Sequence, residues 1–286
     1  MRCLMIPFFF ILVIIMGKNS PIGLFDSGVG GLTVAHALHT LLPSEQLVYY
    51  GDTVHLPYGD KSRETIIDYS TGIADFLLKQ KCKVILIACN SASSNAYEEV
   101  MQHVGKKALV INVIDPIVDR VCSASSTIRS VGIIGTKATI ASGTYEKKIA
   151  ASHFAPKPQV NSLATPLLVP MIEEGFVFDD ISNAIIRSYL SRKELQGIDS
   201  LILGCTHYPI IRNQISRFYN FEVNVLDTAR IVAEAVRESL KTSDLMSSKK
   251  PGPDEFYVSD HTTYFEAIAN MFFNEKIKLK RNNIWK

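Results

Sequence analysis

Two cysteines stand at matching places in the chain and could carry acid–base chemistry. Cys89 follows the apolar run Val84–Ala88, and Cys205 follows the apolar run Leu201–Leu203. Each run predicts a buried strand that leads into a helix, and ligands of α/β proteins bind outside the carboxyl ends of such strands. Free N–H groups and the helix dipole at a helix N-terminus favour the thiolate form of cysteine. We therefore expect both thiols to be activated.

Two thiols facing one another suit the inversion of a stereocentre without a cofactor. One group removes a proton from one face of the substrate, and the other delivers a proton to the opposite face. A thiol has a pKa of about 8.5 and can take either role near neutral pH once its environment lowers that value. The α-proton of an amino acid is very weakly acidic, so hydrogen-bond donors must stabilise the charge that develops on the carboxylate. Polar side chains stand beside each thiol: Asn90 and Ser91 beside Cys89, and Thr206 and His207 beside Cys205.

The composition narrows the class of protein. The 286 residues are 47% hydrophobic and 20% charged, which is typical of a globular protein, and the formal net charge is +2. No long basic run is present, so the charge pattern argues against a nucleic-acid partner. The five cysteines form no CxxC motif, and no His/Cys pair has metal-ligand spacing, which argues against a disulfide scaffold and a metal site. We expect a soluble protein of a reducing compartment, with Cys82 and Cys122 as buried apolar side chains.

Short apolar runs alternate with amphipathic stretches from Pro21 onward. The runs are rich in β-branched residues and end at turn residues, which is typical of buried strands. The alternation predicts right-handed βαβ units and parallel sheets that are covered on both faces, an α/β fold. The expected strands are Ile22–Phe25, Leu47–Tyr50, Val84–Ala88, Leu109–Val113, Val131–Ile134, Leu201–Leu203 and Val223–Leu226. The expected helices include Arg63–Gln80, Ser91–Val104, Asp179–Leu195 and Ala229–Leu240.

An internal repeat divides this pattern into two halves. Residues 22–27 resemble residues 131–136, because each stretch has an apolar residue, a glycine, two apolar residues and then a polar turn. Residues 84–91 resemble residues 200–207, which places the two cysteines at equivalent positions. Two matches in the same order and at similar spacing favour a duplicated domain. We expect two pseudo-symmetric, doubly wound parallel-sheet domains with the active site in the cleft between them.

The seams between these domains are expected at Asp115-Pro116 and Asp227-Thr228. Residues 17–115 together with 228–286 would then form the first domain, and residues 116–227 the second. The last sixty residues would thus return to the first domain.

Residues 1–16 are set apart from this organisation. Leu4–Met16 is an apolar run behind Arg2, shorter than the roughly 20 residues that span a bilayer and similar to the core of a signal peptide. No A-x-A-like cleavage site follows, and Met16 would make an alternative start. Two interpretations stay open: an apolar leader that acts as a signal or anchor, and a wrongly chosen start codon.

Five blocks of the sequence resemble those of the bacterial glutamate racemases. In chain order they are Asp26–Thr33, Tyr50–Asp52 with Leu56–Gly59, Ala88–Ser93, Pro166–Gly175 and Gly204–Pro209. The resemblance runs from about Pro21 to about Phe272, so residues 1–16 and the basic tail Lys278–Lys286 fall outside it. Ser91 stands where many members carry threonine, which keeps the hydroxyl group.

This resemblance implies a glutamate racemase, an isomerase that needs no pyridoxal phosphate, metal or nucleotide cofactor. Cys89 would act on D-glutamate with the help of Asp26. Cys205 would act on L-glutamate with the help of His207, which Glu173 orients. Substrate contacts are implied for Asp26, Ser27, Tyr58, Gly59, Asn90, Ser91, Thr206 and His207.

The resemblance also implies a cellular role. The enzyme would be cytoplasmic and would supply D-glutamate for peptidoglycan biosynthesis, and so for cell wall biogenesis and cell shape. Glutamate would be its partner, with no membrane or nucleic acid, and members of the family are often homodimers.

Several of these residues also have a plain structural interpretation. Asp26 could cap a helix, a role that aspartate fills well after a strand. The glycines Gly28, Gly30 and Gly31 lack the G-x-G-x-x-G spacing of a dinucleotide site. The pair Tyr58-Gly59 could simply form a turn. Glu173 and its neighbour Glu174 point about 100° apart on a helix, so only one of them can face the cleft.

Other functions remain open on the sequence. A racemase of the same family could act on aspartate or another acidic amino acid, because one methylene group is worth only about 1–3 kcal/mol of discrimination. An amino-acid-binding protein could keep the fold, although it would not need two thiols. A cysteine-nucleophile hydrolase would need one cysteine and a histidine and would leave the second cysteine unexplained.

Overall fold

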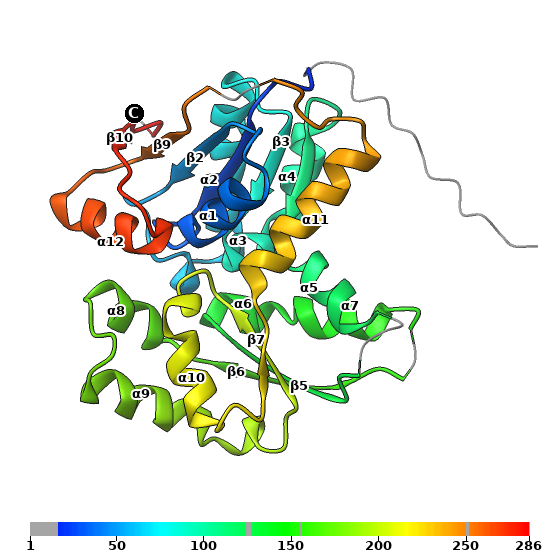
Figure 1. Cartoon of the computed structure of the whole chain (residues 1–286), viewed down its shortest axis with the longest axis vertical. Helices are drawn as coiled ribbons and strands as arrows, with labels where there is room; N and C mark the ends of the chain where they lie inside the picture. The colour runs from blue at the N-terminus through cyan, green and yellow to red at the C-terminus, as the bar shows by residue number, and fades with distance from the viewer. Residues whose placement is uncertain (1–16, 124–126, 155, 250–251, 286) are drawn as a thin grey trace, which may run out of the picture.

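Two parallel sheets form the framework of the computed structural model, which describes residues 17–123, 127–154, 156–249 and 252–285 (Figure 1). In this part of the chain one sheet has six strands, in the order β10-β9-β2-β1-β3-β4, and the other has four, in the order β6-β5-β7-β8. We call the regions built on them the first lobe and the second lobe. The six strands are β1 (Ile22–Asp26), β2 (Leu47–Gly51), β3 (Val84–Ile87), β4 (Leu109–Asn112), β9 (Glu255–Val258) and β10 (Leu279–Arg281). The four are β5 (Ser130–Gly135), β6 (Gln159–Ala164), β7 (Ser200–Gly204) and β8 (Asn224–Val225).

Helices surround both sheets. Those packed around the first sheet are α1 (Leu32–Leu41), α2 (Arg63–Lys79), α3 (Asn90–Asn95), α4 (Tyr97–Val104), α11 (Thr228–Thr242) and α12 (Thr263–Phe273). Those nearer the second sheet are α5 (Asp115–Val121), α6 (Lys137–Ser142), α7 (Thr144–Ala151), α8 (Leu168–Glu173), α9 (Asp180–Leu190) and α10 (Arg212–Phe218). Three short 3₁₀ turns are η1 (Tyr58–Asp60), η2 (Lys193–Leu195) and η3 (Tyr208–Ile211).

The first sheet is buried on both faces, which explains why its central strands are continuous apolar runs. Successive side chains of a strand point to opposite faces. Accordingly Leu24 of β1 packs into the core that contains α1, α11 and α12, whereas Phe25 packs into the core beneath α2 and α4. This doubly covered arrangement leaves only the carboxyl ends of the strands free to form a site.

The two lobes share one topology. The order β2-β1-β3-β4 in the first sheet matches the order β6-β5-β7-β8 in the second, strand for strand, and all of these neighbours run parallel. The sequence repeat had paired β1 with β5 and β3 with β7. The predicted α/β fold with two pseudo-symmetric, doubly wound sheets is therefore confirmed. Strands β9 and β10, from the end of the chain, extend the first sheet beyond the repeated unit.

The structure corrects two of the predicted helices. The stretch expected as one helix over Ser91–Val104 is broken at Ala96, where the backbone leaves the helical region (φ −129°, ψ 0°). Side chains of serine and asparagine in α3 bond to carbonyls of the helix itself; Asn95 Nδ2, for example, donates to Ser91 O at 2.9 Å. Such bonds compete with the helical ladder. The helix expected to reach Leu195 ends at Leu190.

Three strands at or next to a sheet edge, β6, β9 and β10, were not predicted. They contain polar residues and are partly exposed, so they lack the apolar runs that mark the central strands. The expectation for residues 1–16 lies outside the described residues. Within the part that is described, no helix is long and apolar enough to span a membrane.

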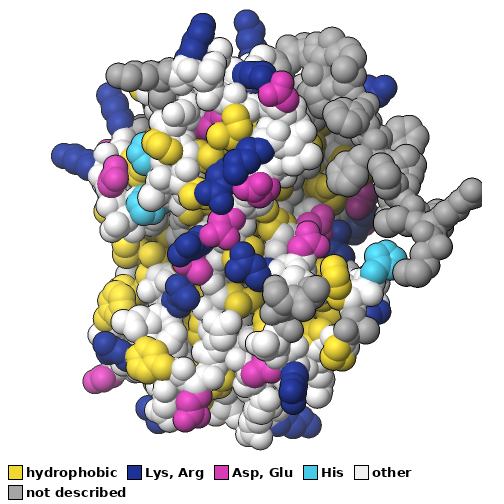
Figure 2. Space-filling model, turned by 45° about the vertical axis from the view of Figure 1, so that its right-hand side comes forward, with side chains coloured by type: hydrophobic (Ala, Val, Ile, Leu, Met, Phe, Trp, Pro, Cys, Tyr) yellow, Lys and Arg dark blue, Asp and Glu magenta, His cyan; other side chains and the backbone are white. Residues whose placement is uncertain are grey.

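Helix α11 runs along the seam between the lobes (Figure 1) and packs against α1 of the first lobe and α5 of the second. Arg120 of α5 forms an ion pair with Glu234 of α11 at 2.9 Å, and Arg230 pairs with the same carboxylate at 3.0 Å. On the face shown in Figure 2, basic and acidic side chains lie among one another instead of forming a patch of one sign.

A buried ion pair fixes the start of β3. Lys83 Nζ donates to Glu45 Oε2 at 2.6 Å and to the Leu245 carbonyl at 2.8 Å, and it also contacts the Lys18 carbonyl. Both charged side chains are almost completely buried. The pair therefore ties the first sheet to the segment that follows α11.

We expect Glu45→Gln to lower the free energy of unfolding in urea by about 3–5 kcal/mol, because it leaves the buried Lys83 ammonium without its counter-charge. Glu238→Gln, which removes the exposed ion pair with Lys241, should change it little. Equal unfolding midpoints for the two variants would contradict this assignment.

Candidate active site

A cavity of about 170 Å³ lies where strand ends from both lobes meet. Its walls come from the loops after β1, β2 and β3 in the first lobe and after β5, β6 and β7 in the second. This volume is below the roughly 300–1,000 Å³ of pockets that hold drug-sized ligands, so it suits a small metabolite. The cavity has the position that the sequence predicts for the active site, between the two sheets.

The structure brings almost all of the predicted site residues to this one cavity. The residues that line it include Ser27, Tyr58, Gly59, Cys89, Asn90, Ser91, Glu173, Cys205, Thr206 and His207. Asp26 does not line the cavity, although it was expected to contact the substrate; its side chain is fully buried behind the wall. Glu174 is exposed, as expected for the carboxylate that points away from the cleft.

In the second lobe, three side chains form a connected chain of acid–base groups. Cys205 Sγ lies 3.8 Å from His207 Nδ1, and His207 Nε2 lies 2.9 Å from Glu173 Oε1. Burial alone would lower the pKa of His207, but its hydrogen bonds to Cys205 and Glu173 raise that pKa well above the usual range. The ring of Phe272 packs edge-on against His207 at 5.1 Å. The raised pKa favours the protonated imidazole, and a cationic imidazole within hydrogen-bond reach is the kind of neighbour that activates a thiol.

The first lobe gives its thiol the opposite environment. Cys89 precedes α3, and its Sγ donates to Ser27 Oγ at 3.7 Å. Burial, together with the nearby Asp26 carboxylate, raises the pKa of Cys89 to about 12. The expectation that the start of the helix lowers this pKa is therefore wrong: desolvation outweighs the N–H groups at the beginning of α3. Cys89 is a neutral thiol at neutral pH.

Asp26 is held by the first lobe and touches the second. Its Oδ2 accepts a hydrogen bond from the Gly31 N–H at 2.9 Å, and its Oδ1 accepts one from the Thr206 hydroxyl at 3.4 Å. The carboxylate therefore secures the turn that begins α1 and also places a negative charge near Cys89. Asp26 is not the N-cap of α1, because Gly31 holds that position and no side chain caps the helix.

The glycines after Asp26 serve to bring the two lobes together. A Cβ atom on Gly30 would lie 2.7 Å from Thr206 Oγ1 and closer still to the ring of His207. A Cβ atom on Gly31 would lie 2.6 Å from Asp26 Cβ. Only glycine leaves this space free, so the glycine-rich turn of the first lobe is what allows His207 of the second lobe to reach the cavity.

A second close approach occurs in the loop after β2. A Cβ atom on Gly59 would lie 2.8 Å from Thr136 Cβ of the second lobe. Beside it, the phenol of Tyr58 lines the cavity and donates to Asp52 Oδ2 at 2.7 Å. Burial raises the pKa of Tyr58 well above its usual range, so the phenol stays a hydrogen-bond donor. Tyr58-Gly59 does form a turn, η1, and this turn is part of the cavity wall.

Hydrogen bonds also cross between the lobes at the start of α3. Asn90 Oδ1 accepts a hydrogen bond from the Tyr145 phenol at 2.9 Å, and Ser91 Oγ lies 2.9 Å from Thr136 Oγ1. These contacts fix Asn90 and Ser91 at the wall of the cavity.

Sequence reasoning missed several residues of the second lobe that line the cavity. Thr136, Lys137 and Thr165 all face it. The internal repeat carried a signal for Thr136, because it aligns this residue with Ser27, but it carried none for the other two. Among the residues that the structure describes, no group of three His, Cys, Asp or Glu side chains could hold a metal ion.

Comparison with known proteins points to one family. The family described as Asp/Glu/Hydantoin racemase matches residues 32–236. A protein of Geobacter metallireducens named glutamate racemase is 39% identical over 257 residues, which are 90% of this chain and 93% of that relative. The crystal structure of glutamate racemase from Francisella tularensis in complex with D-glutamate has a TM-score of 0.85 and 36% identity, covering 94% of this chain and 99% of that chain. Glutamate racemase from Thermus thermophilus, in complex with β-chloro-D-alanine, has a TM-score of 0.81 and 35% identity, covering 93% of this chain and 98% of that chain.

The two thiol environments predict different reactivity toward iodoacetamide at pH 7. Cys205 should be alkylated at least about tenfold faster than Cys89, because the thiolate is the nucleophile. Both thiols are similarly buried, at 6% and 5% exposure, so access alone would not separate them. Peptide mapping by mass spectrometry measures both rates, with Cys82 and Cys122 as internal controls. Faster labelling of Cys89 would contradict the assignment.

The close approach at Gly30 can be tested separately. Gly30→Ala should displace His207 and slow the alkylation of Cys205 about tenfold, since the imidazolium no longer stabilises the thiolate. Gly28→Ala is the matched control, because its Cβ atom would lie 3.5 Å from Leu56 Cδ2, an ordinary contact distance. The packing argument fails if both variants react like the unmodified protein.

Proposed function

The chain belongs to the Asp/Glu/hydantoin racemase family, and we propose that it is a glutamate racemase that interconverts L- and D-glutamate through Cys89 and Cys205. This isomerase would use no cofactor, since both proton transfers are assigned to side chains of the cavity. The observation that carries the proposal is the pair of buried thiols that line one small cavity from opposite lobes. Inversion of an α-carbon needs an acid and a base on opposite faces of the substrate.

In the direction from L- to D-glutamate, the Cys205 thiolate takes the α-proton. The thiol of Cys89 then gives its proton to the opposite face of the same carbon. The negative charge that develops on the carboxylate is stabilised by hydrogen-bond donors of the cavity wall. Side chains that can contribute to this stabilisation, or hold the substrate, are Ser27, Asn90, Ser91 and Thr206, with the backbone of the Tyr58-Gly59 turn, because the Tyr58 phenol already donates its hydrogen to Asp52.

The two environments suit this direction. Burial raises the pKa of Cys89 to about 12, which keeps its proton available for transfer, and His207 Nδ1 lies 3.8 Å from the Cys205 sulfur, where a protonated imidazole favours a thiolate. In the direction from D- to L-glutamate the roles reverse: Asp26 assists Cys89 as the base, and His207, oriented by Glu173, supports Cys205 as the acid. The two enantiomers have equal free energy in water, so kcat/KM must be equal in the two directions. Any difference that the thiol environments cause between the two directions must therefore change kcat and KM by the same factor.

The choice of glutamate over aspartate rests on the relatives named glutamate racemase, at 37–39% identity over most of this chain. A racemase of another acidic amino acid remains the alternative, because the same two thiols would serve it equally well. By the same family membership we propose that the enzyme acts in the cytoplasm and supplies D-glutamate to peptidoglycan biosynthesis, and thus to cell wall biogenesis and cell shape. We propose a homodimer as its assembly.

The proposal predicts that the purified protein, with no cofactor added, racemises glutamate in deuterated water. Deuterium should enter the α-position of the product enantiomer. Cys89→Ser and Cys205→Ser should each lower racemisation at least about 10²-fold, the usual scale for a positioned proton-transfer group. Cys82→Ser and Cys122→Ser are matched controls, because these thiols lie outside the cavity and should leave activity per folded molecule unchanged.

Each contrary outcome has its own meaning. Faster racemisation of aspartate than of glutamate would keep the mechanism and change the substrate. Absence of exchange with both amino acids would leave a binding protein as the better interpretation. Normal racemisation by both active-site serine variants would overturn the two-thiol mechanism, and a trapped acyl-enzyme would indicate a hydrolase.

A further inference from the structure

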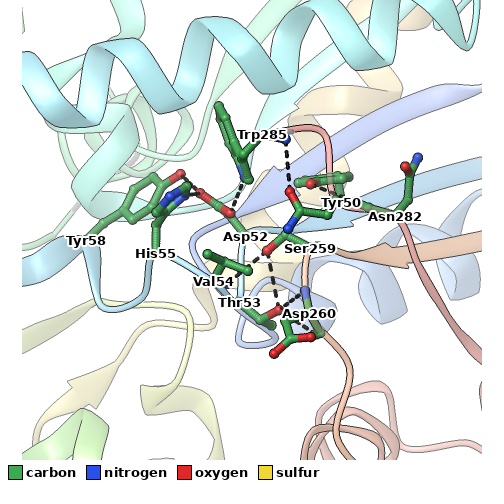
Figure 3. A network of polar contacts seen from close by, with 11 residues as sticks. Tyr50, Asp52, Thr53, Val54, His55, Tyr58, Ser259, Asp260, Asn282 and Trp285 are labelled. Carbon is green, nitrogen blue, oxygen red and sulfur yellow. Dashed lines mark hydrogen bonds and ion pairs between the residues drawn. The ribbon is translucent and has the colours of Figure 1, made fainter.

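The last residues of the chain contact the loop that carries Tyr58 and Gly59 (Figure 3). After β10, the carbonyl of Asn282 accepts a hydrogen bond from the Tyr50 phenol at 3.0 Å. Three residues further on, Trp285 Nε1 donates to Asp52 Oδ1 at 2.8 Å. The segment Asn282–Trp285 therefore binds the end of β2 and the start of the loop that follows it.

Asp52 connects this tail to the cavity. Its side chain is fully buried, and its other oxygen, Oδ2, accepts hydrogen bonds from the Tyr58 phenol at 2.7 Å and from His55 Nδ1 at 2.9 Å. A buried carboxylate needs donors for both of its oxygens. The indole N–H is the side-chain donor to Oδ1, so Trp285 fixes the orientation in which Oδ2 can hold Tyr58.

The indole ring lies in a socket formed by His55, Tyr69 and Gly72. It packs edge-on against His55 at 5.0 Å and against Tyr69 of α2 at 5.4 Å, and these two rings stack on one another at 4.0 Å. A Cβ atom on Gly72 would lie 2.8 Å from Trp285 Cζ3, so the glycine in α2 leaves room for the ring. Since several elements shape this socket, the position of Trp285 is well defined.

The same loop is held a second time by the segment after β9. Thr53 Oγ1 donates to the Asp260 carbonyl at 2.6 Å, and the Val54 N–H donates to Ser259 Oγ at 2.9 Å (Figure 3). A loop without regular structure is usually among the more mobile parts of a protein. Here the end of the chain restrains it on the side away from the cavity.

We propose that Trp285 is a positioning residue for residues 52–59, which we call the substrate loop. Through Asp52 it fixes the Tyr58 phenol and the Gly59 backbone at the cavity wall. This inference rests on the proposed glutamate racemase function. Trp285 does not line the cavity that contains the two thiols. Its loss should therefore weaken substrate binding and leave the proton transfers largely intact.

The test compares two variants of the tail. Trp285→Phe keeps an aromatic ring in the socket and removes the N–H group. We expect KM for L-glutamate to rise about tenfold while kcat stays within about threefold, the pattern of an interaction used in binding and not in the chemical step. Lys280→Ala is the matched control, because it removes an exposed side chain of the adjoining strand β10 and should leave both constants unchanged.

Fluorescence gives a second readout that a merely structural role would not produce. Trp285 is the only tryptophan of the chain, so intrinsic tryptophan emission reports on this socket alone. Addition of L-glutamate should shift or quench the emission of the unmodified protein. Tyr58→Phe removes the hydroxyl that joins the cavity to Asp52 and should abolish that change, even at glutamate concentrations that saturate the variant.

The outcomes separate the inference from the function on which it rests. If the unmodified protein fails to exchange the α-proton of glutamate, the proposed function fails. If it racemises glutamate and Trp285→Phe has the KM of Lys280→Ala, the inference about Trp285 is wrong. A proportional loss of activity and melting temperature at unchanged KM would assign Trp285 to stability alone and would also overturn it. The same emission change in Tyr58→Phe would rule out the path through Asp52.

Discussion

The site depends on two places where the backbone of the first lobe passes so close to the second lobe that only glycine fits. Gly30 leaves space for Thr206 and His207, and Gly59 leaves space for Thr136. These contacts close a small cavity over two thiols and keep them away from bulk water. Interactions between charges are much stronger in such an environment than in water. The strong effects of His207 and Asp26 on the neighbouring thiols follow from that closure.

A repeated fold here produces unequal chemistry. The strands β1 and β5, and likewise β3 and β7, occupy equivalent places in the two sheets, and each lobe presents one cysteine after the third strand of its repeat. The neighbours of the two thiols differ: a carboxylate lies near Cys89, and an imidazole near Cys205. Burial and the nearby carboxylate raise the pKa of Cys89, whereas Cys205 has an imidazole within hydrogen-bond reach. The repeated strands thus give the thiols equivalent positions, and the side chains beside them give the thiols different environments.

The central strands and most of the cavity could be predicted because their signals are local. Strands buried on both faces are continuous apolar runs, and the site residues follow them directly in the sequence. Strands β6, β9 and β10 were missed because they lie toward the sheet edges and are partly polar. The pKa of Cys89 was predicted in the wrong direction, because burial and a carboxylate from a distant strand are properties of the folded chain. Thr165 and Trp285 gave no signal for the same reason: what each contacts is far away in sequence.

The order of the strands along the chain has a consequence for biosynthesis. The second lobe is built from one continuous stretch, β5 to β8, whereas the first sheet includes β9 and β10 from the end of the chain. On the ribosome, where folding follows the emergence of each segment, the four-stranded sheet can be completed while the six-stranded sheet still lacks its last strands. Asp52 Oδ1 lacks the hydrogen bond from the indole N–H until Trp285 has left the exit tunnel. The loop after β2 therefore reaches its final form only after the whole second lobe has been synthesised.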